Sequence, residues 1–124
     1  MTIHIDTSAL VDALTGPRRT LDTLIAFAEE GHRLALSTIV LYEWLRGPRT
    51  PAELAVQEDL FPRARAVPFG PGAAAVAAGL YRTVSRPRGR EIDLAVAACA
   101  LQDGARLWTL NRADFRDVPG LSLL

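Results

Sequence analysis

The stretch at residues 90–115, R-E-I-D-L-A-V-A-A-C-A-L-Q-D-G-A-R-L-W-T-L-N-R-A-D-F, constrains the fold most. It opens with two acids, Glu91 and Asp93, continues in small and apolar residues and reaches Gly104, which predicts a buried helix with a glycine stop. Residues 105–110 are too apolar for a solvated loop and predict a buried strand. Asp114 follows that strand closely. Ligands of open α/β sheets bind at the carboxyl ends of the strands, so these acids can share one pocket.

The rest of the chain alternates between strand-like and helix-like segments. Strands are expected at 2–5, 33–36, 65–69 and 105–110, with a last edge strand at 118–123; helices are expected at 8–14 (closed by Gly16 and Pro17), 18–30, 38–46, 51–60, 71–84 and 91–102. This alternation predicts an α/β fold, a three-layer α/β/α sandwich around a short, mostly parallel sheet. Its length predicts a single domain, residues 1–124.

Composition narrows the class of protein. Fourteen basic and fourteen acidic residues cancel, so no global field steers the chain to nucleic acid. Every basic residue is Arg, whose guanidinium suits bidentate phosphate contacts. Cys99 is the single cysteine, which excludes an intrachain disulfide and fits a reducing compartment. No apolar run approaches the ~20 residues that span a bilayer, and the start lacks a signal peptide, so we expect a cytoplasmic protein.

Four acids stand at expected element ends, and each also has an ordinary structural explanation. Asp6 follows the first strand and could simply cap the next helix. Glu43 is the one charge within the run T-I-V-L-Y-E-W-L, where an unpaired Glu is rarely buried, although it could lie on an exposed face. Asp93 could complement a helix dipole, and Asp114 could make a local turn. Taken together, the four favour a common site.

If these carboxylates converge, their repulsion decides the chemistry. Two carboxylates about 5 Å apart at an effective dielectric of ~20 repel by roughly 3 kcal/mol. Several such pairs would rival the ~5–15 kcal/mol stability of a domain. Such a cluster persists only with shared protons or a bound cation. Oxygen ligands select a hard ion, Mg²⁺ or Mn²⁺, that orients water and stabilises charge on a phosphoryl oxygen.

The pattern resembles the PIN-domain family, and within it the toxin nucleases of VapBC toxin–antitoxin pairs. The resemblance covers nearly the whole chain and rests on four pieces: I-D-T-S-A-L at 5–10, Y-E-W-L-R-G at 42–47, I-D-L-A-V-A-A-C-A at 92–100 and T-L-N-R-A-D-F at 109–115. Each piece is short, and their order in so short a chain makes the match specific. The resemblance implies a PIN-like fold.

The resemblance also implies roles for individual residues. Asp6, Glu43, Asp93 and Asp114 would be the catalytic acidic quartet and the metal ligands, with Asp6 and Asp93 nearest the ion. Thr7 or Ser8, and Asn111, would orient the carboxylates. Glu91 is an extra acid that the family motif does not require. The number of metal ions, one or two, stays open.

The activity implied by the resemblance is Mg²⁺-dependent endoribonuclease cleavage, with a metal-activated water attacking the phosphodiester. It further implies an RNA substrate (single-stranded or tRNA-like), a cognate antitoxin protein and a homodimer. Arg86, Arg88, Arg90 and Arg112 are candidates for holding substrate phosphates, and a solvated Arg-rich loop is the alternative explanation.

Several other residues have a plainer expected role. His4, Cys99, Trp44 and Trp108 are expected to be packing residues, although the two indoles could also stack bases. The Ala-rich residues 73–80 predict close helix packing, with a dimer interface as a further possibility.

Two other functions compete. A phosphohydrolase of the haloacid-dehalogenase type also begins with a strand ending in Asp, but it needs a second acid where Ser8 stands and a Lys that this chain lacks. A non-catalytic PIN-like module that acts only by binding a partner is the other alternative. The intact quartet argues against that alternative.

Overall fold

The computed structural model describes residues 1–16 and 20–124. In chain order the elements are β1 (Thr2–Ile5), α1 (Thr7–Leu14), α2 (Leu21–Glu29), β2 (Arg33–Ala35), α3 (Thr38–Arg46), α4 (Pro51–Leu60), η1 (Arg63–Arg65), α5 (Pro71–Thr83), α6 (Glu91–Gln102), β3 (Arg106–Trp108) and η2 (Arg112–Asp114). The expected helices are therefore present to within a few residues. The predicted helix end at Pro17 and helix start at Arg18 lie outside the described residues.

The three strands form a parallel sheet in the order β2-β1-β3. The register pairs Ile3 of β1 with Leu34 on one side and Arg106 on the other. The strand made first is thus the central one, and its Ile3 and Ile5 are fully buried. Parallel strands need long crossovers, which the helices provide. The prediction of a short parallel sheet wrapped by helices is confirmed.

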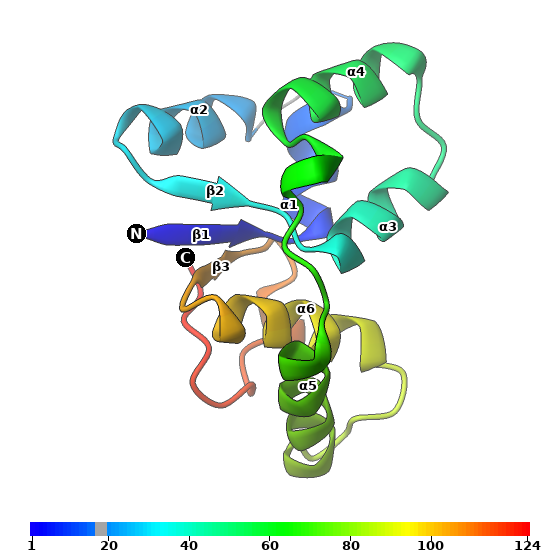
Figure 1. Cartoon of the computed structure of the whole chain (residues 1–124), viewed down its shortest axis with the longest axis vertical. Coiled ribbons are helices and arrows are strands. Elements are labelled where there is room, and N and C mark those ends of the chain that lie inside the picture. The colour runs from blue at the N-terminus through cyan, green and yellow to red at the C-terminus, as the bar shows by residue number, and fades with distance from the viewer. Residues whose placement is uncertain (17–19) are drawn as a thin grey trace.

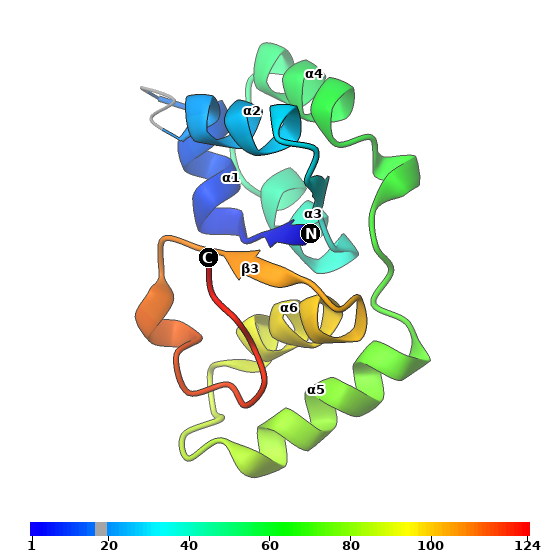
Figure 2. The same cartoon turned by 90° about the vertical axis from the view of Figure 1, so that its left-hand side faces the viewer.

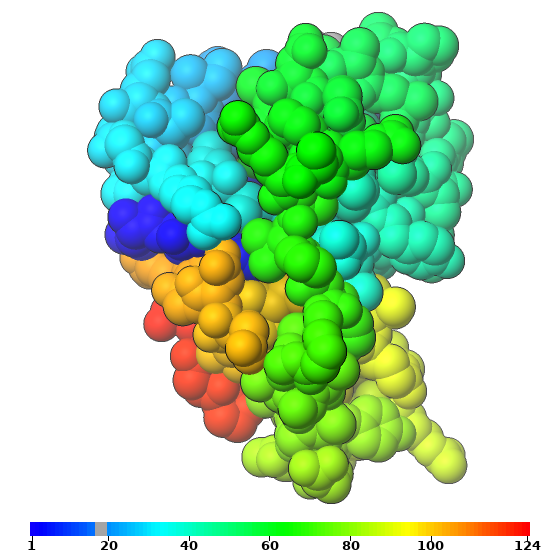
Figure 3. Space-filling view, viewed as in Figure 1, coloured from blue at the N-terminus to red at the C-terminus, as the bar shows by residue number. Residues whose placement is uncertain are grey.

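The helices lie on both sides of the sheet (Figure 1). Helices α1, α2 and α4 lie on one side, and α5 and α6 lie on the other, with α3 beyond the carboxyl end of β1. Figure 2 shows the same division after a quarter turn, with the η2 loop on the side of β3 away from α4. The segment from η1 to α5 joins the two halves across one face of the molecule (Figure 3).

Helix α6 is the packed centre of the lower half. All seven of its residues from 94 to 100 are buried, because the sheet covers one side of the helix and α5 another. Alanine at most of these positions permits close approach of the flanking elements. The expected close packing of the Ala-rich segment is confirmed for α5, where Ala73 and Leu80 are buried.

Two predicted strands are wrong. Residues 65–69 form no strand beyond one parallel bridge between Val67 and Ser37, and residues 118–123 contribute one bridge between Leu123 and Leu107. Pro68, directly after Val67, lacks the N–H that a longer ladder would need, and the backbone N–H groups of Val118 and Leu121 bond within a local turn instead of to a strand. In the described part of the chain, no helix is long and apolar enough to cross a bilayer.

Candidate active site

Asp6 follows β1 directly and occupies the N-cap position of α1, yet its side chain caps nothing. Its Oδ2 instead accepts hydrogen bonds from Thr109 Oγ1 at 2.7 Å and from Ser8 Oγ at 3.1 Å. The residue is only 4% exposed. The explanation of Asp6 as a helix cap is therefore wrong. Its carboxylate is held from two segments of the chain, and its Oδ1 makes no hydrogen bond with any described residue.

Thr109 is a site residue that the sequence reasoning missed. It is the first residue after β3 and is 3% exposed. Its hydroxyl accepts the Asn111 backbone N–H at 2.9 Å, and the Ser8 hydroxyl accepts the Leu110 N–H at 3.0 Å. An ionised carboxylate can only accept, so both hydroxyls donate to Asp6 Oδ2, and the two hydroxyl oxygens lie 3.3 Å from each other. The sequence signal was Thr109's place in T-L-N, directly after a strand.

Glu43 lies on α3 next to the fully buried Trp44. Its Oε1 accepts the Thr7 hydroxyl at 2.6 Å, and its Oε2 lies 3.5 Å from Arg46 Nη2. The Glu43 side chain is 19% exposed. Thr7 is the first residue of α1, so this contact ties α3 to the carboxyl end of β1, where Asp6 stands.

Asp93 lies within electrostatic reach of the three other predicted acids. Burial and then the charges of Asp6, Asp114 and Glu43 together raise its pKa to about 6, while Arg90 opposes the shift. The structure thus brings Asp93 near each of the other three acids. Asp93 stands in the first turn of α6 and Asp114 ends the η2 turn, so both lie on connections at the sheet's carboxyl edge.

The donor set fits a hard cation in its chemistry. The four groups are all carboxylates, and Asp6 keeps one oxygen without a hydrogen-bond partner among the described residues. Within residues 1–16 and 20–124, no three His, Cys, Asp or Glu side chains are already placed to hold a metal ion together. Mg²⁺ fits such a loose arrangement because it usually keeps several waters and takes one or two carboxylates.

The residues expected to orient the carboxylates, Thr7, Ser8 and Asn111, differ in the hydrogen bonds that they make. Thr7 bonds Glu43 and Ser8 bonds Asp6, so both hydroxyls contact carboxylates. Asn111 acts differently from expectation: its backbone N–H, rather than its side chain, orients Thr109. Glu91 accepts the Gly89 N–H at 3.3 Å and is not among the charges that act on Asp93.

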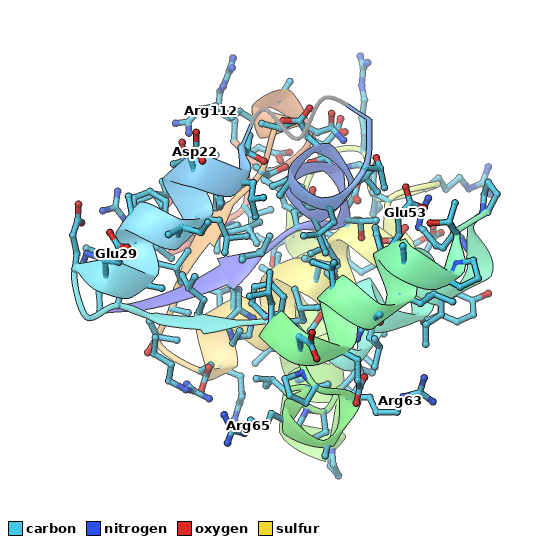
Figure 4. The ribbon with its side chains drawn as sticks, turned by 90° about the horizontal axis from the view of Figure 1, so that it is seen from above. Asp22, Glu29, Glu53, Arg63, Arg65 and Arg112 are labelled. Atoms are coloured by element: carbon cyan, nitrogen blue, oxygen red, sulfur yellow. The ribbon has the colours of Figure 1, made fainter. Side chains whose placement is uncertain are left out.

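Of the four candidate phosphate-binding arginines, two bind acceptors within the protein and two are exposed. Arg90 binds Asp117 and the Asp114 carbonyl, and Arg112 donates to the Leu124 carbonyl at 2.6 Å, so both guanidiniums already have protein acceptors. Arg112 lies at the edge of the molecule in the view of Figure 4. Arg86 and Arg88 are exposed, and for them phosphate binding stays a prediction.

The residues expected to be structural are buried. Trp44 and Trp108 are 0% and 8% exposed, so base stacking by either indole is wrong. Burial lowers the pKa of His4, whose Nε2 lies 2.8 Å from Asp103 Oδ2, so the neutral ring donates to that carboxylate. Cys99 is 1% exposed.

A family model described as "PIN domain" matches residues 3–121. Among solved structures, the chain is similar to DNA-bound VapBC from Salmonella typhimurium (TM-score 0.82, 20% identity, 100% of this chain and 97% of that chain). It is also similar to VapBC2 from Rickettsia felis, bound to a promoter DNA fragment (TM-score 0.77, 22% identity, 100% and 98%). A third is VapBC-5, a toxin–antitoxin system member from Mycobacterium tuberculosis (TM-score 0.63, 22% identity, 98% and 93%). No curated protein matches the chain.

Proposed function

The chain belongs to the PIN-domain family, and from this premise we propose that it is a Mg²⁺-dependent endoribonuclease, the toxin of a VapBC-type pair. The observation that supports this most is the setting of Asp93, where burial and then the charges of Asp6, Asp114 and Glu43 raise the pKa of its carboxyl to about 6. Carboxylates placed in this way without a cation repel one another. The site is therefore suited to an ion and to a reaction in which negative charge develops on phosphate oxygens.

Each residue has a distinct part in this mechanism. Asp6 and Asp93 would hold the ion, Mg²⁺ or Mn²⁺, with Glu43 and Asp114 contributing directly or through water. The ion, when bound, activates a water and neutralises charge on the scissile phosphate. Ser8 and Thr109 keep Asp6 Oδ2 occupied, so the free Oδ1 is the oxygen offered to the ion. Thr7 holds Glu43 in the same way.

The two other functions have less support. A dehalogenase-type phosphohydrolase needs an acid where Ser8 stands and a Lys, and the chain contains no Lys. A non-catalytic module has no need for two hydroxyls on Asp6 and one on Glu43. These bonds between side chains serve carboxylate placement.

The substrate and partners follow from the proposed family role. The substrate is RNA, single-stranded or tRNA-like, with Arg86 and Arg88 as exposed phosphate contacts. The protein partner is a cognate antitoxin. A mostly apolar surface groove, lined by Ala77, Ala78, Tyr81, Arg82, Glu91 and Leu94, offers it a docking place. A homodimer in the cytoplasm completes the proposal.

The test compares RNA ends after controlled expression of wild type, Asp93→Asn and Asp59→Asn. Asp59 is an exposed acid on α4 and serves as the matched control. We expect discrete new RNA ends from wild type and Asp59→Asn, and a loss of at least about 100-fold in Asp93→Asn, since this change removes a charge that the transition state needs. The purified protein should cleave with Mg²⁺ and stop in EDTA. Equal cleavage by Asp93→Asn would contradict the proposal.

A further inference from the structure

Arg90 joins three separate segments with one guanidinium. Its Nη1 and Nη2 donate to the two carboxylate oxygens of Asp117 at 3.0 and 2.6 Å. Its Nη2 also donates to the Asp114 carbonyl at 2.9 Å, and its Nη1 lies 3.4 Å from the Arg86 carbonyl. Arg90 itself occupies the N-cap position of α6. The fork thus links the loop before α6, the start of α6 and the loop after β3.

Asp114 is joined to α6 by this link. Its side chain is exposed and makes no hydrogen bond within the described residues, and its backbone N–H bonds only locally, to the Asn111 carbonyl at 3.0 Å. The next residue, Phe115, is 1% exposed and anchors the loop in the core. Among the hydrogen bonds of the described residues, the one from Arg90 to the Asp114 carbonyl joins Asp114 itself to the start of α6, the helix that carries Asp93.

The same guanidinium affects the acids by charge. It lowers the pKa of Asp93 against burial and three carboxylates, and its bond with Asp117 raises its own pKa. Arg90 is 20% exposed in its side chain, and a bidentate Arg–carboxylate pair has a fixed orientation. Arg90 therefore affects both the position of Asp114, through its hydrogen bond, and the pKa of Asp93, through its charge.

We propose that the Arg90–Asp117 pair is a positioning clamp that fixes Asp114 relative to Asp93 and thereby sets the affinity of the acidic site for its divalent ion. This inference rests on the proposed function for its metal. It assigns Arg90 a place beside the acids instead of the phosphate contact expected from sequence, and it gives a role to Asp117, which the sequence reasoning did not consider.

The clamp is tested with Asp117→Asn, Arg90→Gln, Arg90→Lys and the double variant Arg90→Gln/Asp117→Asn. Arg63→Gln is the matched control, because it breaks an exposed ion pair with Glu58 (3.7 Å) on the opposite side of the molecule from Arg112 (Figure 4). The first measurement is backbone amide hydrogen exchange in the metal-free protein. We expect faster exchange at residues 112–118 in Asp117→Asn, with the rest of the chain and the melting temperature unchanged, and no change in Arg63→Gln.

The second measurement is the Mg²⁺ concentration that gives half-maximal RNA cleavage. We expect Asp117→Asn to raise it about tenfold, as for other partners of metal ligands, with little change in the maximal rate. Arg90→Lys keeps the charge but loses the fork, so it should not restore wild-type behaviour. The double variant should be no worse than Arg90→Gln, because both changes break one clamp.

Unaltered exchange at 112–118 in Asp117→Asn would overturn the clamp, as would full function in Arg90→Lys. Exchange is measured without metal or RNA. A protein that cleaves no RNA but shows the local exchange change would refute the proposed function and leave the clamp's structural half standing.

Discussion

The carboxylates of Asp6 and Asp93 are both partly or wholly buried, but different groups compensate their negative charges. Asp6 is almost fully buried but accepts hydrogen bonds from two hydroxyl groups, which themselves accept backbone N–H groups. Asp93 is near three other acids and is opposed by one guanidinium, Arg90. Because the charges of three other acids act on Asp93, substitution of Asp93 is the most direct test of the repulsion within the cluster.

Asp93→Asn should raise the melting temperature of the metal-free protein at neutral pH. The folded-state pKa, about 6, exceeds the ordinary value of 3.8, so the folded state binds more protons between these values and wild-type stability falls as pH rises through that window. The gain should thus be largest above pH 7 and vanish near pH 4. Solvent screening reduces this gain in the free energy of unfolding to on the order of 1 kcal/mol, which corresponds to a rise of a few degrees in melting temperature.

Thermal unfolding in EDTA at pH 4 and 7.5 measures this effect, with Asp59→Asn as the control. A gain equal at both pH values would point to altered packing or helix propensity and contradict the electrostatic account.

At the residue scale, the sequence predicted which acids to examine, because acids at element ends are visible in the primary structure. Thr109 escaped because a threonine after a strand has many uses, and only the fold shows its hydroxyl 2.7 Å from Asp6, 103 positions earlier. Arg90 was considered only as a phosphate contact, and its pairing with Asp117 was missed for a related reason. Its acceptor Asp117 lies 27 positions away in a loop whose path no periodicity reveals.

At the element scale, the residues at helix ends predicted the helices better than the apolar runs predicted the strands. Ser37 accepts the Val40 N–H and begins α3 as expected. Thr50 and Glu53 form a complete capping box with Pro51 in the first turn of α4. Strand predictions were weaker, since Val67 is followed by a proline and Leu123 follows a local turn, so each makes only an isolated bridge.

Thr50→Ala should destabilise the protein by about 1 kcal/mol, because the Glu53 N–H loses its side-chain acceptor while α4 remains hydrophilic and exposed. The measurement is urea unfolding, with an unchanged slope and a lower midpoint. Thr50→Ser, which keeps the acceptor, is the control and should stay close to wild type. Equal losses in the two variants would show that the cap contributes nothing.

For the whole molecule, the acids come from separate elements around the carboxyl end of the central strand. Glu43 lies on α3 beyond that end, Asp93 lies in the first turn of α6 on one side of the sheet, and Asp6 directly follows β1. An ion bound there joins elements that otherwise meet through few contacts, since α3 and α6 touch only modestly compared with α5 and α6.

Mg²⁺ should therefore raise the melting temperature of wild type in a concentration-dependent way. Ligand at 100 times its dissociation constant adds about 2.7 kcal/mol when it binds only the folded state. Differential scanning fluorimetry across a Mg²⁺ series measures the shift, with Ca²⁺ and choline chloride controlling for charge and ionic strength. Asp93→Asn should lose most of it. An identical shift in that variant would place the ion elsewhere.

The sheet order has a consequence for synthesis. Of the three strands, β1 leaves the ribosome before the other two, yet one of its edges stays unpaired until residues 106–108 arrive, and the last acid of the quartet follows six positions later. A growing chain that has not reached residue 114 lacks part of the acidic quartet whatever else it has formed.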